Sequence, residues 1–461
     1  MEFDYVIVGG GSAGCVLASR LSEDPAVTVC LLEAGGAGRS WMVEVPFGIV
    51  LAVPTPFINW GFKTVPQVEC RGRRLYQPRG RALGGSSAIN AMIYTRGHPA
   101  DYDGWAAAGC RGWSYKEVLP YFRRAEANTR FRDAYHGNDG PLPVNDSCTG
   151  NPMQQVFIEA ARQAGHAVNP DFNGAEQEGV GVYQLTQKEG ERWSAARAYL
   201  YPQLARPNLK VLTHAHAHRV RFRDRRAWGV DYRRPNGAVE TVSARREVIL
   251  SAGAFQSPQL LMLSGVGDAE ALQNLGMEVL HDLPAVGKNL QDHVDYTFIH
   301  RARSLDLLGG SPAGVARFVR ELGRYRRERR GMLASNVAEA GGFLKSDPGL
   351  GVPDLQLHFC IGVVHNHGRT LQHLHHGYSL HVCALRPKSR GQVRLASRDP
   401  HEAPLIDPRY FSQPEDLEVL LKGFKLARRI VDAPAFAPYR RKELFSRGVE
   451  TDQGIRELIR A

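Results

Sequence analysis

A glycine-rich turn between an apolar strand and a helix, close to the start of the chain, constrains the fold more than any other sequence feature. The turn has the spacing Gly-x-Gly-x-x-Gly, and its predicted phosphate-contacting residues are Gly9, Gly11, Ser12, Ala13 and Gly14. The apolar residues 5–8 before it are typical of a strand buried on both faces of a parallel sheet. Such a turn lets phosphate groups approach the backbone and the N-terminus of the next helix.

An acidic residue follows the next predicted strand. Residues 27–32 form an apolar run that ends at Glu33 and Ala34. At this distance from the turn, a carboxylate can accept hydrogen bonds from both hydroxyls of a ribose. A glycine turn that served packing alone would leave Glu33 unexplained, so the pattern predicts a dinucleotide site. This motif does not distinguish FAD from NAD.

Two longer segments are more specific. Residues 80–90 are Gly-Arg-Ala-Leu-Gly-Gly-Ser-Ser-Ala-Ile-Asn, and residues 253–267 are Gly-Ala-Phe-Gln-Ser-Pro-Gln-Leu-Leu-Met-Leu-Ser-Gly-Val-Gly. The small residues of the first segment allow backbone to lie against a flat ligand where a Cβ atom would clash. In the second segment we expect a strand to end near Gly253 and a helix to begin at Ser257-Pro258.

These segments together resemble the two signatures of the glucose–methanol–choline (GMC) family of flavin-dependent oxidoreductases. The resemblance continues through 96–98, 171–174, 286–293 and 387–391, and so it covers essentially the whole chain. Within the family, the chain is most similar to choline-dehydrogenase-like and aliphatic alcohol dehydrogenases. The resemblance implies an FAD-dependent oxidoreductase that converts a primary alcohol, either an aliphatic alcohol or choline, to an aldehyde. It also implies an electron acceptor such as a quinone or another carrier.

The resemblance implies a set of residues around FAD. The first group would lie against the pyrophosphate and the ring: Gly84, Gly85 and Ser86. The second would lie beside the isoalloxazine: Asn90, Ala91, Met92 and Ile93. The third comes from the later strands: Ala217, assigned to the adenine from spacing alone, with Gly253 and Ala254.

One position bears on how the cofactor is held. Some family members attach FAD through a histidine in the loop that corresponds to residues 84–90, and by spacing this position is Ala88. Alanine has no nucleophilic atom. We therefore expect FAD to be bound non-covalently.

The predicted fold is α/β, with a Rossmann-like FAD-binding domain and an α+β substrate domain built on an antiparallel sheet. We expect the FAD-binding domain to comprise residues 1–145 and 190–297. The substrate domain would comprise residues 146–189 and 298–445. Residues 446–461 are expected to be a truncated C-terminal helix.

In the family, a histidine takes the hydroxyl proton while hydride passes to flavin N5. It belongs to a late segment of the form His-Pro-x-Gly-Thr-x-Arg-Met-Gly, which does not occur in this sequence. Neither His98 nor His293 is a substitute, because each belongs to a different family segment. We therefore predict no catalytic residue within the chain and expect the family histidine beyond Ala461.

This departure leaves alternatives open. The chain is either a truncated form of an active alcohol dehydrogenase, or a natural short protein that binds flavin poorly or does no alcohol chemistry. A flavoprotein of the same fold with a non-oxidative activity, such as a lyase, is a third alternative. Sequencing beyond the codon for Ala461 would separate the first two.

The charge of the chain suggests anionic partners. The formal net charge is 58 − 47 = +11, which favours a dinucleotide phosphate or an acidic lipid. We expect no nucleic-acid binding, since no nucleic-acid module is recognisable. A basic helix over 314–330, with apolar Val315, Phe318, Val319, Leu322 and Tyr325 on one face, allows a peripheral membrane contact. The expected location is cytoplasmic, with possible attachment to the inner face of the membrane, and we expect no secretory leader.

A histidine-rich segment resembles a metal site only superficially. Its members are His365, His367, His373, His375 and His376. Their spacing matches no known ligand set, and the surrounding glycine and polar residues favour a loop. We therefore predict no metal.

Overall fold

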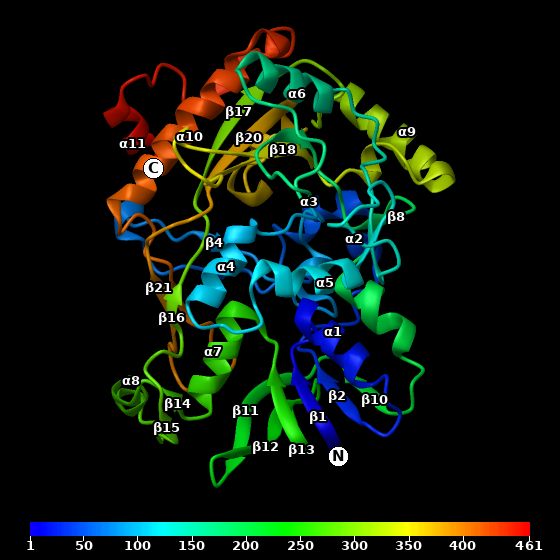
Figure 1. The fold of residues 1–461 in the computed structure, drawn as a ribbon, viewed down its shortest axis with the longest axis vertical. Coiled ribbons are helices and arrows are strands. Elements are labelled where there is room, and N and C mark those ends of the chain that lie inside the picture. Colours follow the sequence, from blue (N-terminus) through cyan, green and yellow to red (C-terminus); the bar gives the residue numbers. More distant parts are fainter.

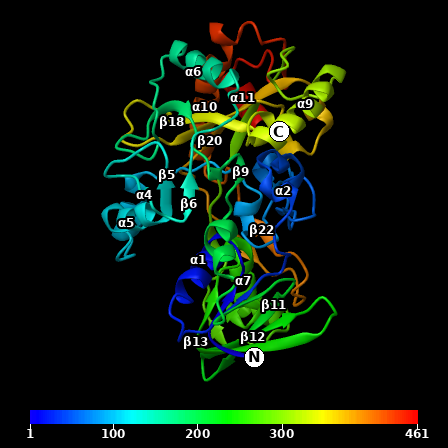
Figure 2. The ribbon, with the colours of Figure 1, turned by 90° about the vertical axis from the view of Figure 1, so that its right-hand side faces the viewer.

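The computed structural model describes the backbone of residues 1–461 and every side chain except that of His373. The molecule is elongated, with a six-stranded sheet near each end of its long axis (Figure 1). Helices α4 (Pro99–Ala107) and α5 (Tyr115–Ala125) lie along one side between the two sheets (Figure 2). We therefore expect the functional site in the region where the two sheets approach each other.

The lower sheet in Figure 1 contains the first glycine turn. Its strand order is β10-β2-β1-β13-β12-β11. The bounds of its strands are β1 Glu2–Val8, β2 Val29–Leu32, β10 Leu209–Leu212, β11 His216–Arg223, β12 Arg226–Arg233 and β13 Val239–Leu250. Strands β10, β2, β1 and β13 pair in parallel, whereas β12 and β11 continue the sheet in antiparallel order. The parallel part confirms the predicted Rossmann-like fold.

Helices cover both faces of this sheet. Ile7 points to the face where it packs with Cys15 and Ala18 of α1 (Ser12–Leu21). Its neighbours Val6 and Val8 point the other way, toward Leu260 of α7 (Gly253–Leu263). Because strand side chains alternate between faces, one apolar run supplies both layers of the core.

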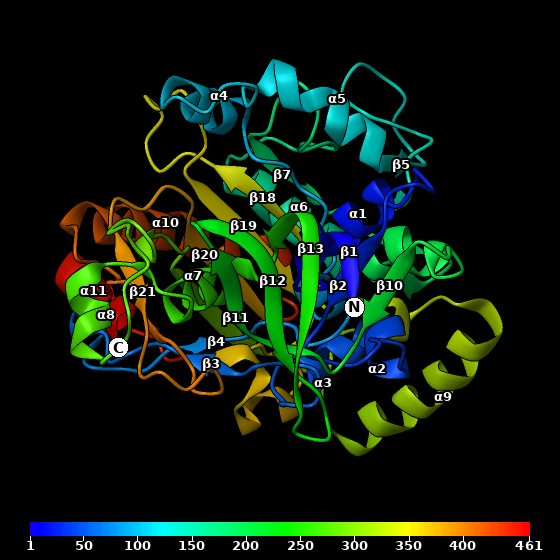
Figure 3. The ribbon, with the colours of Figure 1, turned by 90° about the horizontal axis from the view of Figure 1, so that it is seen from below.

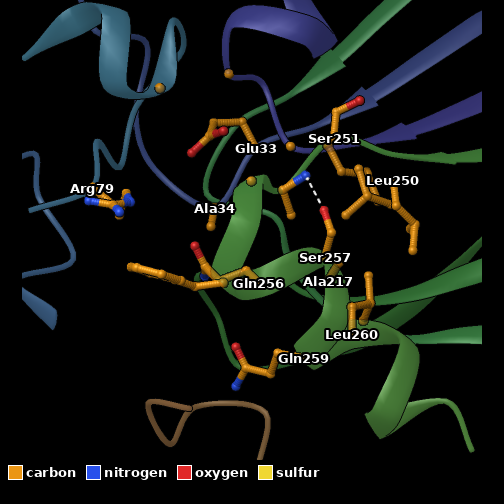
Figure 4. Close-up of a pocket in the computed structure, with 18 of the residues that line it drawn as sticks. Glu33, Ala34, Arg79, Ala217, Leu250, Ser251, Gln256, Ser257, Gln259 and Leu260 are labelled. Carbon is orange, nitrogen blue, oxygen red and sulfur yellow. Dashed lines mark hydrogen bonds between the residues drawn. The ribbon is translucent and has the colours of Figure 1, made fainter. Parts of the chain in front are cut away.

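Helix α7 begins earlier than the sequence indicated. We expected it to start at Ser257-Pro258, but it starts at Gly253, which has a φ of +84° and turns the chain directly out of β13. Pro258 therefore lies inside the helix. Ser257 Oγ accepts a hydrogen bond of 3.0 Å from the backbone N–H of Ala252 (Figure 4). A glycine in the left-handed region made the earlier start possible.

The upper sheet is entirely antiparallel, as predicted for the substrate domain, and has the order β23-β17-β20-β19-β18-β7. Its strands are β7 Gly179–Val182, β17 Asp295–Arg301, β18 Ala338–Leu344, β19 Leu355–Cys360, β20 Gly377–Ala384 and β23 Lys442–Leu444. The predicted domain boundary at 297/298 falls inside β17, and the domain division otherwise stays a prediction.

Three helices pack against the upper sheet and complete its core. They are α6 (Met153–Gln163), α10 (Pro414–Asp432) and α11 (Asp452–Arg460). Phe298 of β17 and Phe424 of α10 are buried with ring centroids 4.6 Å apart. Ile455 and Ile459 of α11 are buried in the same core, and Arg456 forms an ion pair with Glu418. Residues 452–460 are thus a packed helix.

The remaining helices and strands lie outside the two six-stranded sheets. The remaining helices are α2 Trp41–Glu44, α3 Ile49–Ala52, α8 Ala269–Asn274 and α9 Pro312–Glu328. The strands β16 Lys288–Leu290, β21 Gly391–Arg394 and β22 Leu405–Asp407 form a three-stranded sheet. Short pairs are formed by β3 Phe62–Lys63 with β4 Tyr76–Gln77, β5 Glu126–Asn128 with β6 Leu142–Val144, β8 Gln187–Lys188 with β9 Glu191–Arg192, and β14 Val266–Gly267 with β15 His281–Asp282. Among the described residues, none of the helices has the length and apolar character of a membrane span.

Candidate active site

The three glycine-rich segments meet at one cavity. This first cavity has a volume of about 470 Å³ and lies at the C-terminal ends of the parallel strands. Ligands of open α/β sheets bind at this edge. The predicted cofactor residues that line it are Gly9, Gly11, Ser12, Ala13, Glu33, Ala34, Gly85, Ser86, Ala217, Gly253 and Ala254. Figure 4 shows Glu33, Ser251 and Ala217 around the start of α7.

Glycine is required at several of these positions because the backbone segments touch. Gly9 has a φ of +100°, and a Cβ there would lie 2.6 Å from the carbonyl oxygen of Ser251. A Cβ on Gly14 would lie 1.9 Å from the oxygen of Gly9, so α1 packs directly on the turn. A Cβ on Gly85 would lie 2.7 Å from Cα of Gly11. The second segment therefore rests on the first turn, and glycines of both segments form part of the cavity wall.

Glu33 is held in place by the turn. Its carboxylate accepts hydrogen bonds from the backbone N–H groups of Gly10 at 2.8 Å and Gly35 at 2.7 Å. Burial raises the pKa of Glu33 to about 7, although these two bonds and the charge of Arg81 act to lower it. A hydroxyl donor placed against this carboxylate would favour its ionised form.

The other predicted cofactor residues lie outside the first cavity. Gly14 is beneath the turn, as described above. Gly84, with a φ of +96°, donates its backbone N–H to the oxygen of Gly10. Met92 is buried, and its oxygen accepts the backbone N–H of Thr186. Gly14 and Gly84 thus contact the turn that lines the first cavity, whereas Met92 packs away from it with Phe172 and Tyr183.

Asn90 is held by Arg192, a residue to which the sequence analysis gave no role. Arg192 Nη1 donates to the backbone oxygen of Asn90 at 2.6 Å and to its side-chain oxygen at 3.0 Å. The same oxygen accepts the backbone N–H of Met92. No described residue accepts a hydrogen bond from the side-chain NH₂ group of Asn90. Both N–H bonds of this group can therefore donate to a ligand. Burial lowers the pKa of Arg192 to about 9. The role of Arg192 in holding Asn90 follows only from the folded structure.

Ala91 and Ile93 line a second cavity of about 600 Å³, which lies on the side toward the upper sheet. Its wall is mostly apolar and includes Leu307, Leu308, Val337, Val363 and Val364. Asn336 Nδ2 donates to the backbone oxygen of Ala91 at 2.8 Å and joins the loop to this wall. The loop 84–93 therefore contributes residues to both cavities.

Two histidines form the polar part of the second cavity. His358 of β19 and His381 of β20 are directly opposite in the antiparallel register, and both line the cavity. His381 Nδ1 lies 2.5 Å from Asp295 Oδ2. Burial acts to lower the pKa of His381, but its hydrogen bonds to Asp295 and Cys360 raise the pKa to about 10. Burial and the charge of His381 lower the pKa of His358 to about 4.

These two side chains thus offer a donor and an acceptor side by side. The protonated imidazole of His381 can only donate hydrogen bonds, whereas the neutral imidazole of His358 has a free lone pair. The sequence analysis missed both residues, because they are 23 positions apart and only the strand register brings them together.

The histidine-rich segment does not gather its members into a ligand set among the described residues. His376 bonds Ser311 and the backbone oxygen of Leu307, while His365 bonds Thr370. His367 lines the second cavity. The side chain of His373 lies outside the described residues.

Comparison with family models identifies the chain. Residues 3–295 match the GMC oxidoreductase N-terminal model, and residues 387–461 match the GMC oxidoreductase C-terminal model. The chain belongs to the GMC oxidoreductase family. The resemblance noted in the sequence is therefore confirmed, and the second match places α10 and α11 within the C-terminal family region.

Curated relatives agree with this assignment. An alcohol dehydrogenase [acceptor] of Pseudomonas putida is 48% identical over 96% of this chain and 80% of its own length. A mitochondrial choline dehydrogenase of Homo sapiens is 43% identical over 100% of this chain and 78% of its own. They confirm the predicted enzyme class, an FAD-dependent oxidoreductase of the alcohol and choline dehydrogenase group.

Solved structures confirm the fold class. A pyridoxine 4-oxidase from Mesorbium loti superimposes with a TM-score of 0.87 at 30% identity, over 99% of this chain and 86% of that one. A formate oxidase superimposes with a TM-score of 0.90 at 26% identity, over 100% and 86%. The cofactor that the family implies is FAD, and the glycine-lined first cavity beside Glu33 fits its dinucleotide part.

Proposed function

We propose that this chain holds FAD non-covalently, with the dinucleotide part in the first cavity, and oxidises a primary aliphatic alcohol in the second cavity to an aldehyde. The observation that carries the proposal is the loop 84–93, which forms part of both cavities. When bound, FAD supplies the hydride acceptor for this reaction. The chain's own residues bind the cofactor, exclude water and position the alcohol.

Non-covalent attachment is supported by the residue at the family's attachment position. Ala88 is fully buried and has no nucleophilic atom. The protein should therefore release all of its FAD on acid precipitation, with the yellow colour in the supernatant. Flavin that stays with the precipitated chain would contradict this part of the proposal.

The second cavity supports an apolar alcohol rather than choline. No acidic side chain lines it within the part of the chain that the structure describes, and Arg317 and protonated His381 bring positive charge. A quaternary ammonium group prefers aromatic faces together with negative charge. Phe47 and Phe318 supply aromatic faces in this cavity, but they share it with Arg317 rather than with a carboxylate. An alkyl chain instead gains about 0.8 kcal/mol for each buried CH₂ group. An aliphatic alcohol therefore fits this cavity better than choline.

His358 and His381 are proposed to orient the hydroxyl group. The lone pair of neutral His358 accepts the hydroxyl hydrogen, and protonated His381 donates toward the hydroxyl oxygen. Any family histidine beyond Ala461 would act in addition to these two. Replacing His358 by Gln should raise KM for the alcohol without changing FAD binding.

The test is anaerobic reduction of the FAD-loaded chain, followed as bleaching of the flavin absorption. We expect bleaching by 1-octanol at concentrations at which choline has no effect, and turnover with an artificial electron acceptor. Preferential bleaching by choline would overturn the substrate assignment. Cyanohydrin cleavage without bleaching would indicate a lyase. A chain that neither turns yellow nor gains stability with FAD would be inactive.

A membrane surface is the proposed source of the alcohol and of the electron acceptor, a quinone or another carrier. Helix α9 projects at the edge of the molecule (Figure 3). It exposes Val315, Val319 and Leu322, whereas Phe318 and Tyr325 pack inward, so the predicted apolar side is divided. Val315 lines the second cavity, and α9 is rich in arginine. An exposed apolar strip beside basic residues is typical of a peripheral membrane helix.

Sedimentation with vesicles tests this contact. We expect the chain to bind vesicles that contain anionic lipid, and Val319→Asp to weaken binding several-fold while alcohol turnover in detergent stays unchanged. Leu350→Asp, an exposed leucine in a loop away from α9, serves as the matched control. Equal binding by all three proteins would contradict the proposal. On a membrane, the chain would sit at the cytoplasmic face.

A further inference from the structure

We propose that His216, His218 and His401 form a binding site for a divalent transition metal ion such as Zn²⁺. The site lies at the rim of the first cavity, which His216 lines. The inference does not depend on the proposed alcohol chemistry. It differs from the expectation from sequence spacing, which predicts no metal.

Backbone geometry brings the three imidazoles together. His216 and His218 lie on β11 on either side of Ala217, and the pairing of β11 with β12 shifts register between Ala217 and Arg219. This irregularity leaves His218 without a partner in the ladder, and its ring lies beside that of His216. His401 comes from a turn in which Asp399 accepts its backbone N–H at 2.8 Å. Ring centroids are 5.4 Å apart for His216 and His218, 5.0 Å for His216 and His401, and 4.8 Å for His218 and His401. His218 and His401 are 183 residues apart in the sequence, so local spacing does not indicate that they lie together.

The nitrogen atoms have the separation that a metal requires. One ring nitrogen from each histidine lies within 4.8 Å of the other two. His216 Nδ1 and His401 Nδ1 are 3.3 Å apart. Two nitrogens that bind one tetrahedral zinc at about 2.0–2.1 Å are about 3.3–3.4 Å apart. Without a metal, the same distance accommodates one N–H···N hydrogen bond.

The hydrogen bonds of the cluster define where its protons lie, and they leave one buried ring nitrogen without a partner. Arg233 Nη1 donates to His401 Nε2 at 2.9 Å, so the proton of this neutral ring lies on Nδ1. Binding of a metal at Nδ1 moves that proton to Nε2. His218 Nε2 is buried and has no partner among the described atoms. A buried ring nitrogen without a partner costs free energy, whereas a metal ligand at this place satisfies it. Three imidazoles and a water molecule are a normal zinc coordination set.

The charged side chains that face the cluster affect its affinity for a cation. Arg233 and Arg81 oppose a cation, while Asp399 and Asp231 favour it. Asp231 is already paired with Arg221 at 2.6 Å. Arg233 is exposed and can turn into solvent, so that His401 Nε2 can carry the proton while Nδ1 binds the metal. Removing the Arg233 charge should therefore strengthen metal binding.

Titration of the full chain with Zn²⁺ and Co²⁺ tests the site. The protein is purified without a histidine tag, stripped with a chelator and measured by calorimetry. We expect one equivalent to bind, and each of His218→Ala and His401→Ala to lower the affinity at least about 100-fold. Arg233→Gln should raise it about 10-fold, because the amide oxygen can accept a hydrogen bond from the imidazole. Bound Co²⁺ should show a tetrahedral visible spectrum without a thiolate charge-transfer band.

His281→Ala is the matched control, since His281 is an exposed histidine away from the cluster. It should bind metal as the parent chain does. Zinc should raise the melting temperature of the parent chain and of the control, but not of the cluster variants. Equal binding in all variants, a thiolate band, or an Arg233→Gln chain with weaker binding would overturn the proposal.

Discussion

The first and second cavities are built in different ways. In the first, backbone segments touch at Gly9, Gly11 and Gly85, and these glycines form part of the cavity wall. The second is lined by side chains from separate elements, including His358 and His381. Backbone contact requires glycine at fixed positions and so leaves a motif in the sequence, whereas an apolar wall accepts many residues of suitable size. This difference explains why the sequence predicts the first cavity but not the second.

The largest expected effect comes from placing a methyl group where two backbones meet. Gly85→Ala introduces a Cβ 2.7 Å from Cα of Gly11, at a φ of +53°. The clash and the left-handed backbone should together weaken FAD binding about 100-fold, measured by flavin fluorescence titration.

Gly112→Ala is the matched control for backbone strain. Gly112 has a φ of +84°, but a Cβ there has no heavy atom within 4 Å. This variant should bind FAD as the parent chain does. If Gly85→Ala and Gly112→Ala bind FAD equally well, the close contact between the two glycine segments does not contribute to FAD affinity.

The second effect concerns the carboxylate beside the first cavity. Glu33→Gln should weaken FAD binding about 10-fold at pH 8, because an amide accepts weaker hydrogen bonds than a carboxylate. The raised pKa of Glu33, about 7, means that the FAD-free protein holds a proton below that pH. Hydroxyl donors favour the ionised form, so FAD affinity should rise with pH and level off above pH 7.

In Glu33→Gln this dependence should disappear, since the amide does not titrate. Calorimetric titrations between pH 5.5 and pH 8 with roughly even steps would measure both proteins. Parallel pH profiles for the two would show that Glu33 does not contact the bound cofactor.

A polar substitution in the second cavity should have a smaller effect. Leu308→Gln places an amide in the apolar wall and should raise KM for 1-octanol about 5-fold, with little change for ethanol. FAD affinity should stay the same, because the first cavity is untouched. Leu350→Gln, at an exposed position, is the control. A rise in KM that is equal for both alcohols would contradict an alkyl-binding wall.

The smallest expected effect concerns stability. The pKa of His381 is raised from 6.5 to about 10 in the folded protein. The stabilisation from its pairing with Asp295 is therefore complete below pH 6.5 and is lost as pH rises through 10. Because Asp295 is partly exposed, Asp295→Asn should lower the melting temperature by only about 1–2 °C at pH 6. The difference from the parent chain should vanish near pH 10, and a constant difference would contradict the pairing.

Much of the fold was accessible from the sequence. The apolar run of β1, the glycine turn and Glu33 predicted the Rossmann-like sheet, because few other structures accommodate this order. The start of α7 was misplaced, since Pro258 is a stronger local signal than Gly253. The left-handed backbone of Gly253 depends on where β13 ends, which local sequence does not encode.

Less of the candidate site was accessible. The glycine motifs located the first cavity, but Arg192, which fixes Asn90, lies 102 residues away in an otherwise unremarkable segment. The pairing of His358 with His381 depends on strand register. The grouping of His216 with His401 depends on how a distant turn packs on β11. Such contacts follow from tertiary structure and leave no local pattern.

The most direct test is a crystal structure of the chain grown with FAD and 1-octanol. We predict the ADP part of FAD between residues 9–14 and the start of α7, with Glu33 at the ribose. The alkyl chain should lie beside Ile93, Leu308 and Val337. FAD density elsewhere, or alcohol density that avoids the second cavity, would contradict the central claim that the loop 84–93 joins a cofactor site to a substrate site.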